Sequence, residues 1–174
     1  MKEHVAGGPH IKKISQINSQ PKYTKEPMKH FVKTAFNIES LFQEETVVNE
    51  KYCLTFLSFL MITRNDSGLR CQACEVNINR HDDDVGSHAK TSRHERSMSE
   101  TPVVTSITDE FIREVRSGLF HCGFCNLVIG AWDVINDHLK SSDHKDKKAS
   151  AKWRLERHIP GIVEHKKQLA QREM

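Results

Sequence analysis

The chain has 174 residues, of which 37% are hydrophobic and 28% are charged, and its formal net charge is +3. This polar composition excludes one large hydrophobic core and favours several small units. The apolar run at residues 52–62 is too short to span a bilayer, so we expect no membrane partner.

The first 27 residues are mildly basic and contain no apolar stretch long enough for a signal peptide. We therefore expect residues 1–27 to form a flexible, disordered arm. Without a secretion signal, the expected compartment is a reducing one, the nucleus, with the cytoplasm as an alternative. The five cysteines are then not expected to form disulfides.

Apolar residues recur at helical spacing between residues 28 and 66, first around Phe31 and again between Cys53 and Met61. This spacing predicts a helical segment over 28–66 that contains two helices. The second helix would be apolar on nearly every side, so something must bury it. Either it forms an intramolecular core with its neighbours, or the helices in 31–64 bind a protein partner or a second copy of the chain. Cys53 is expected to be a small buried residue.

Two cysteine–histidine quartets follow, and both have spacings typical of zinc fingers. The first reads C-x2-C-x13-H-x5-H and the second reads C-x2-C-x12-H-x5-H. A hairpin and a helix can deliver two thiolates and two imidazoles at these spacings to one tetrahedral Zn²⁺. Four protein ligands close each site, so the two zinc ions would stabilise the fold and would not catalyse. The predicted ligands are Cys71, Cys74, His88, His94, Cys122, Cys125, His138 and His144.

The quartets belong to an internal repeat, with a step of 51 residues from Cys71 to Cys122. The tripeptide Ser-Gly-Leu precedes each quartet, as Ser67-Gly68-Leu69 before Cys71 and as Ser117-Gly118-Leu119 before Cys122. We therefore predict two ββα-type zinc fingers, finger one at residues 67–98 and finger two at residues 119–148. Apolar residues at matching offsets would form their small cores: Ile78, Val85, Ile129 and Ile135.

Five residues separate the two histidines of each finger, which is a long spacing for a finger with one continuous helix. An unbroken helix would rotate the second imidazole away from the first, so the helix must kink between them. Thr91-Ser92 in finger one and Ser141-Ser142 in finger two tolerate such a break. The linker between the fingers is also too long for tight tandem reading of about three base pairs per finger.

The linker at residues 99–118 carries signals for a helix. Thr108 has the properties of an N-cap, acidic residues follow it, and Gly118 is a typical stop signal. Such a helix would couple the orientations of the two fingers.

Finger two carries a further pattern, in which H-L-K stands at the first histidine and H-K at the second. Its matching positions are Cys122, Cys125, Ile129, His138, Leu139, Lys140, His144 and Lys145. This pattern resembles matrin-type or double-stranded-RNA-binding zinc fingers. The resemblance implies a kinked helix, long linkers, a nuclear setting and binding to structured RNA, in a group that also has DNA-binding and protein-binding members. Finger one departs from it, because Ala89 stands at the leucine position and residues 82–84 are acidic.

The sequence after His144 is basic. Residues 149–174 are expected to continue the helix of finger two as a basic tail that ends near His158, just before Pro160. Outward-facing basic side chains here either contact phosphates or are only a solvated charged face. The candidate nucleic-acid-binding residues are Lys140, Lys145, Lys147, Lys148, Lys152 and Arg154.

The predicted fold class is a set of small zinc-stabilised α+β modules joined by helices, mostly α overall. The sequence shows no glycine-rich phosphate loop, activated nucleophile or open metal site, so we expect neither an enzyme nor a small-molecule substrate. The expected function is a nuclear adaptor that binds structured or double-stranded RNA, favoured over DNA, through finger two and its tail. The alternatives are a protein-interaction scaffold and a DNA-binding transcriptional or chromatin regulator that uses the same fingers.

Overall fold

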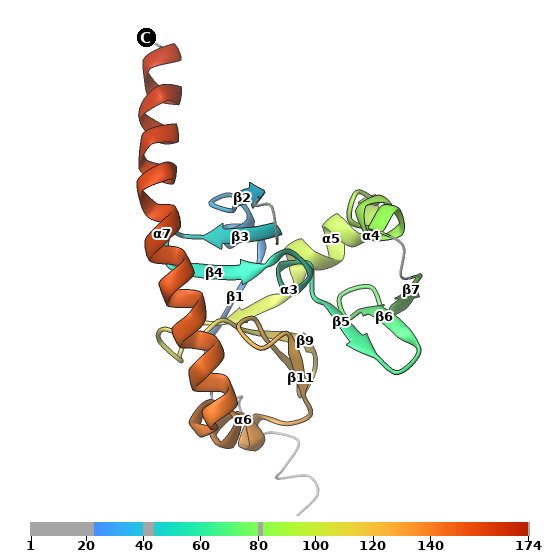
Figure 1. Cartoon of the computed structure of the whole chain (residues 1–174). Coiled ribbons are helices and arrows are strands. Elements are labelled where there is room, and N and C mark those ends of the chain that lie inside the picture. The colour runs from blue at the N-terminus through green and yellow to red at the C-terminus, as the bar shows by residue number, and fades with distance from the viewer. Residues whose placement is uncertain (1–22, 40–43, 80–81, 174) are drawn as a thin grey trace, which may run out of the picture.

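The computed structural model describes residues 23–39, 44–79 and 82–173. Within these residues the chain forms eleven strands and six helices, with one long helix along the side of the body (Figure 1). The elements in chain order are β1 (Lys25–Pro27), α2 (Lys29–Val32), β2 (Phe36–Glu39), β3 (Glu44–Val48), β4 (Tyr52–Thr55), α3 (Phe56–Phe59), β5 (Ile62–Asn65), β6 (Gly68–Cys71), β7 (Val76–Ile78), α4 (Asp82–Ala89), α5 (Ser92–Glu100), β8 (Pro102–Val104), β9 (Ile112–Arg116), β10 (Leu119–Cys122), β11 (Leu127–Ile129), α6 (Trp132–Lys140) and α7 (Ser142–Arg172).

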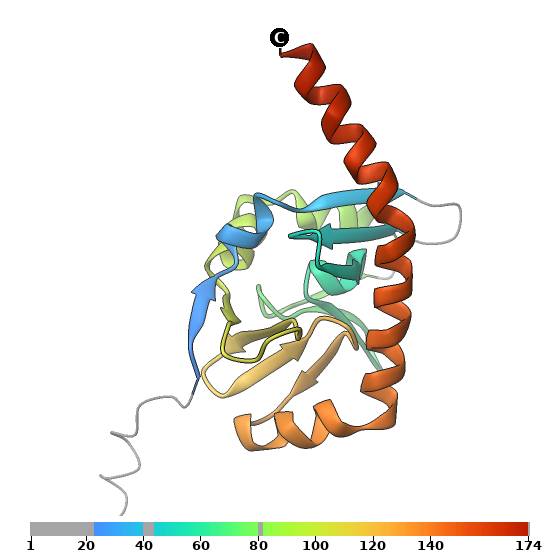
Figure 2. The same ribbon diagram turned by 90° about the vertical axis from the view of Figure 1, so that its left-hand side faces the viewer.

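The strands form three antiparallel sheets, ordered β1-β8-β9-β10-β11, β2-β3-β4 and β5-β6-β7. The prediction of a mostly α fold is therefore wrong, because the described chain is a mixed α+β structure. Most of the predicted arm, residues 1–22, lies outside the described residues, and its last part is β1, which pairs with β8 at a sheet edge. Figure 2 shows α7 running along one side of the body and projecting beyond it.

The segment 28–66 is mainly strands, which corrects the prediction of two helices joined to the fingers. Asn49 and Glu50 have φ values of 52° and 55°, and Lys51 N–H donates to the Val48 carbonyl at 3.0 Å. These features form a type I′ turn, which joins β3 to β4 with the twist that a hairpin needs. Phe56 and Leu57 of the predicted second helix are half-buried, and its other apolar residues are buried within the chain: Cys53, Leu54, Phe59, Leu60, Met61 and Ile62.

The predicted linker helix is wrong as well, because its place is taken by strand β9. Ser117 and Gly118 connect β9 to β10, and Gly118 has a φ of 74°, which residues with a side chain rarely adopt. Pairing with β10 overrides the local helix signals after Thr108. The repeated Ser-Gly-Leu tripeptide marks this hairpin in the sequence, since in finger one it runs from the end of the turn between β5 and β6 into β6.

The two fingers are built alike. In each, a hairpin ends at the first cysteine, a tight turn carries the second, a third strand follows, and two helices separated by a break carry the histidines. The predicted boundaries 67–98 and 119–148 leave out the first strand of each hairpin, β5 and β9. The predicted core residues of both fingers are buried: Ile78, Val85, Ile129 and Ile135.

Helix α7 continues for 31 residues, so the predicted helix end near His158 is wrong. Pro160 lies inside the helix and has no N–H to donate to the carbonyl of Glu156. Both Pro160 and Glu156 are exposed. That carbonyl can bond to water instead. Beyond the proline, Ile162 is buried in a small cluster with residues of β3 and β4, which keeps the helix docked.

A buried polar network joins the two fingers into one body. Arg113 on β9 is fully buried, and its guanidinium donates to two carbonyls of α3, at 2.5 and 2.7 Å, and to His121 Nδ1 at 2.9 Å. His121 Nε2–H in turn donates to Asn126 Oδ1, whose amide donates to the Ile62 carbonyl on β5, each at 2.8 Å. Because these bonds cross between the fingers, the fingers are not independent modules on a flexible linker.

Candidate metal centres

The cysteines of each quartet are placed by the end of a hairpin and the turn that follows it. Cys71 is the last residue of β6, and Cys74 N–H donates to its Sγ at 3.4 Å. The residue after the second cysteine has a positive φ in both fingers, 61° at Glu75 and 50° at Asn126. This left-handed backbone folds the chain back on itself, so both sulfur atoms of a finger face one point.

The second histidine of each finger is placed by the predicted break in the helix, which the structure confirms. The Thr91 hydroxyl caps α5 by accepting from His94 N–H, and the Ser141 hydroxyl caps α7 by accepting from His144 N–H, both at 3.2 Å. The new helix turns the second histidine back toward the first. In both fingers the two imidazole centroids are 4.8 Å apart.

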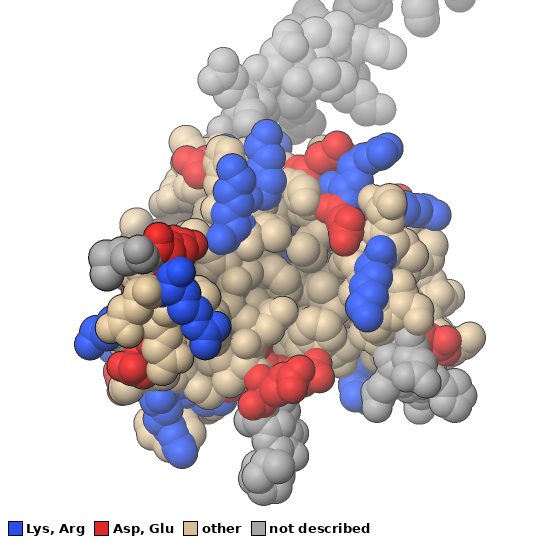
Figure 3. Space-filling model, turned by 90° about the horizontal axis from the view of Figure 1, so that it is seen from above, with Lys and Arg blue, Asp and Glu red and all other residues tan. Residues whose placement is uncertain are grey.

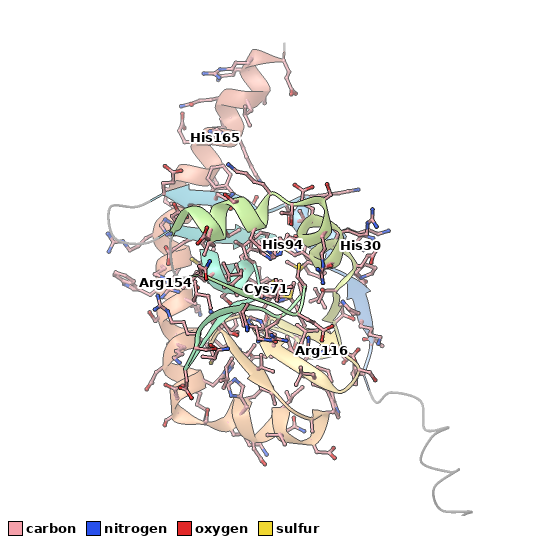
Figure 4. All side chains as sticks on the ribbon, turned by 90° about the vertical axis from the view of Figure 1, so that its right-hand side faces the viewer. His30, Cys71, His94, Arg116, Arg154 and His165 are labelled. Atoms are coloured by element: carbon pink, nitrogen blue, oxygen red, sulfur yellow. The ribbon has the colours of Figure 1, made fainter. Side chains whose placement is uncertain are left out.

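The distances within each quartet fit a tetrahedral metal site. All ligand atoms of a quartet lie within 4.8 Å of one another. In finger one, His94 Nδ1 is 3.4 Å from Cys71 Sγ and 3.6 Å from Cys74 Sγ, and His144 Nδ1 has the same two distances to the sulfurs of finger two. Tetrahedral bonds to a zinc ion would hold a sulfur and a nitrogen about 3.6 Å apart. Each quartet could therefore hold a metal ion, as the sequence spacing predicts. Figure 4 shows Cys71 and His94 close together in finger one.

Buried nitrogen atoms support the same interpretation. Nε2 of His88 and Nε2 of His138 are buried and have no hydrogen-bond partner among the described residues. Leaving such an atom unpaired costs about 1–3 kcal/mol, which a metal ligand role would offset. The first histidine of each finger would then bind through Nε2 and the second through Nδ1.

The electrostatics of the quartets favour a bound cation. Burial raises the pKa of the Cys71 thiol to about 12 and lowers the pKa of His94 to about 4. In finger two, the hydrogen bond between the thiols raises the pKa of Cys122 and lowers the pKa of Cys125 to about 5. Neutral imidazoles are ready to bind a metal, and a divalent cation would stabilise the thiolates that burial alone disfavours.

A third group of ligand-type residues has a different explanation. Atoms of Glu45, Cys53 and His158 also lie within 4.8 Å of one another. The Glu45 carboxylate, however, already pairs with Arg154 and with His158 Nε2, the latter at 2.6 Å. Burial raises the pKa of Cys53 to about 11, so it stays a thiol, as expected of a small buried residue. This group is an ion-pair cluster that docks α7 on β3 and β4, and Figure 4 labels Arg154 at that contact.

The six predicted nucleic-acid-binding residues fall into two sets. Lys148 is paired with the partly buried carboxylate of Glu110, and Arg154 with the buried carboxylate of Glu45. Lys147 pairs with Asp143 on the surface of α7. The other three are exposed and have no ion pair among the described residues: Lys140, Lys145 and Lys152.

Two residues near these lysines have roles that the sequence does not predict, namely Glu110 and Trp153, which is expected from the sequence to pack back on the finger. Glu110 Oε2 accepts a hydrogen bond from His144 Nε2–H at 2.9 Å, behind the metal centre of finger two. Trp153 on α7 is 57% exposed, and the Arg157 guanidinium lies 4.6 Å from the centre of its indole ring. Glu110 and His144 are 34 positions apart in the sequence and meet only in the folded chain, so no local sequence pattern predicts their contact.

Positive charge is concentrated on α7 and not spread evenly over the molecule. On the face seen from above in Figure 3, Lys and Arg alternate with Asp and Glu around a neutral centre. A phosphate backbone laid on that face would meet both signs. Over its whole length, helix α7 contains nine Lys or Arg and four Asp or Glu.

His121 gives a test of the buried network that supports finger two. Burial, with the Arg113 charge next to it, lowers the pKa of His121 from 6.5 to about 3. The unfolded chain therefore binds a proton below pH 6.5 that the folded chain does not, so folding stability is full above pH 6.5 and falls toward pH 3. We expect the free energy of unfolding of wild type to fall about 1.4 kcal/mol per pH unit more steeply than that of His121→Gln between pH 6 and pH 4. Equal slopes in chemical denaturation would contradict this role, since both proteins keep all metal ligands.

Comparisons of the chain with protein-family models, curated proteins and solved structures gave no match. Among the described residues, no helix combines the length and apolarity that a membrane span requires.

Proposed function

We propose that each quartet holds one zinc ion and that the outer face of α7 binds structured RNA. Two thiolates and two imidazoles in a tetrahedral arrangement are a donor set that Zn²⁺ prefers. All four positions of each site are protein ligands, which suits a structural ion. The zinc ions would hold the fingers in the shape that presents α7.

The main support for the proposed RNA binding is the composition of one exposed face of α7. This face carries four exposed residues: Lys145, Lys152, Trp153 and Arg157. The last three follow Lys145 by seven, eight and twelve residues, and these spacings place all four on one side of the helix. The buried residues of the helix lie on the other side: His144, Ala151 and Ile162. Lysines attract phosphates, and an exposed indole stacked with a guanidinium is a surface on which an unpaired base can stack.

The break in the finger helix favours RNA over DNA. A straight finger helix can place its first turn in the wide major groove of B-form DNA. In this chain the helix restarts at Ser141, so α7 leaves the finger at a new angle with its lysines on the outside. Such a helix is suited to follow phosphates and 2′-hydroxyls of an A-form duplex, whose deep major groove excludes side chains. A nuclear adaptor is the role that the resemblance to matrin-type fingers implies.

The test compares charge removal at two places on the same helix. Lys145→Gln with Lys152→Gln should weaken binding to duplex RNA roughly tenfold at moderate salt and reduce the salt slope by about 2, because two phosphate contacts are lost. Lys167→Gln with Arg172→Gln removes the same charge from the far end of α7 and should change little. Fluorescence anisotropy at two salt concentrations measures both quantities.

Trp153→Ala separates base stacking from phosphate attraction. On an RNA hairpin with an unpaired loop it should weaken binding by about 1–3 kcal/mol, and on a fully paired duplex it should have little effect.

Two outcomes would overturn the RNA proposal. One is an equal loss of affinity in the two double variants that remove charge from α7, and the other is preferential binding to duplex DNA that RNA does not compete for. The second outcome would favour a DNA-binding regulator.

A further inference from the structure

The two metal centres differ in what lies behind the second histidine. In finger two, His144 Nε2–H donates to Glu110 Oε2 at 2.9 Å, and the side chains are 1% and 11% exposed. In finger one, Nε2 of His94 is also buried and has no partner among the described residues. Two sites with the same four ligand types are therefore distinguished by one carboxylate.

The register of the strands explains the difference. Ile62 and Ile112 each pair with the first cysteine of their finger, so they are equivalent positions. The residue two places earlier is Leu60 in finger one and Glu110 in finger two. Leu60 is buried and apolar, and its side chain has no atom that can accept a hydrogen bond from an imidazole.

Glu110 is itself held in position. Lys148 Nζ donates to its Oε1 at 2.5 Å, so each carboxylate oxygen has its own partner. Lys148 lies one helical turn after His144 on α7, and Glu110 precedes β9. The pair therefore fixes the carboxylate between two elements that both belong to finger two, with little freedom to turn away from the imidazole.

We propose that Glu110 is a positioning residue that makes the metal centre of finger two bind zinc more tightly than the centre of finger one. The inference rests on the proposed zinc binding. By accepting from Nε2–H, the carboxylate fixes the tautomer in which the lone pair of His144 Nδ1 points to the sulfurs, and it makes Nδ1 more basic. Loss of a partner of this kind changes metal affinity about 10–100-fold. At one zinc ion per chain, finger two fills before finger one.

The experiment titrates zinc into the full-length metal-free chain and follows the imidazole resonances of His94 and His144 by ¹⁵N NMR. In wild type, His144 should respond first, with dissociation constants for the two sites that differ about 10–100-fold. Glu110→Gln keeps the shape of the side chain but removes its charge, so the ratio should approach 1 and the His144 Nε2–H proton should move upfield. Asp109→Asn is the matched control, because it removes an exposed carboxylate next door, and Asn tolerates the φ of 64° found there. It should behave as wild type.

A second variant separates positioning from a general loosening of the fold. Lys148→Met breaks the clamp between the loop and α7 but leaves the carboxylate on His144, so the filling order should persist. The inference is overturned if Glu110→Gln keeps the wild-type order, if wild type fills both sites equally or finger one first, or if Lys148→Met loses the order as fully as Glu110→Gln. If neither histidine responds to zinc, the proposed function itself fails.

Discussion

Replacing Cys71 by serine is expected to unfold finger one and to destabilise finger two, which keeps its own metal centre. The variant loses a thiolate ligand of the first metal centre, and structural zinc binding contributes about 10–16 kcal/mol in small fingers. Natural domains have total stabilities of only about 5–15 kcal/mol. The loss reaches finger two because the network from Arg113 through His121 and Asn126 ends on α3 and β5, which lead into finger one.

Amide NMR spectra of the full-length chain measure this coupling residue by residue. In Cys71→Ser, the dispersed signals of finger one should collapse, and those of finger two should be lost at a lower denaturant concentration than in wild type. Cys53→Ser is the matched control, since Cys53 is equally buried but lies outside both quartets, and its cost should be about 1–2 kcal/mol. A Cys71→Ser chain in which finger two keeps the wild-type resistance to denaturant would show that the fingers fold independently.

Arg113→Met is expected to be the most destabilising substitution outside the metal ligands. The guanidinium is fully buried, and burial lowers its pKa to about 9. Its charged form is therefore stabilised by hydrogen bonds to buried acceptors and not by water. Methionine fills much of the space but leaves two carbonyls of α3 and His121 Nδ1 without a donor. Each unpaired buried acceptor costs about 1–3 kcal/mol, so we expect a loss of about 3–5 kcal/mol.

Arg116 offers the control for that substitution. It lies on the same strand and contacts Gln72 and Glu75 of finger one, but its side chain is 33% exposed. Arg116→Met should therefore cost less than about 1 kcal/mol in chemical denaturation. Similar losses for the two variants would mean that the buried network does not join the fingers.

The sequence was sufficient for the features that depend on local spacing. The quartets, the break at Thr91 and Ser141 and the four core residues of the fingers follow from intervals between residues in one unit, and the structure confirms them. The strands did not follow in the same way. Residues 112–116 carry an apolar pattern that a helix or a half-buried strand can satisfy, and only pairing with β10 decides between them.

Partners distant in sequence explain the other differences. Lys148 and Arg154 look like exposed basic residues on a helix, yet each pairs with a carboxylate that is distant in sequence. The partner of Lys148 is 38 residues away and partly buried, and the partner of Arg154 is buried on β3. The helix continues past Pro160 because Ile162 packs on strands more than a hundred positions earlier. No short window of the sequence contains these contacts, so the sequence alone predicts solvent-exposed charges and a helix that ends at the proline.

Native mass spectrometry of the full-length chain, combined with amide NMR before and after chelation, tests most directly whether two zinc ions organise this fold. We expect the folded chain to carry two zinc ions, and we expect their removal by a chelator to abolish the dispersed amide signals of both fingers. Restoring zinc should bring the signals back. A chain that stays folded without metal, or that is fully folded with fewer than two zinc ions, would contradict the account.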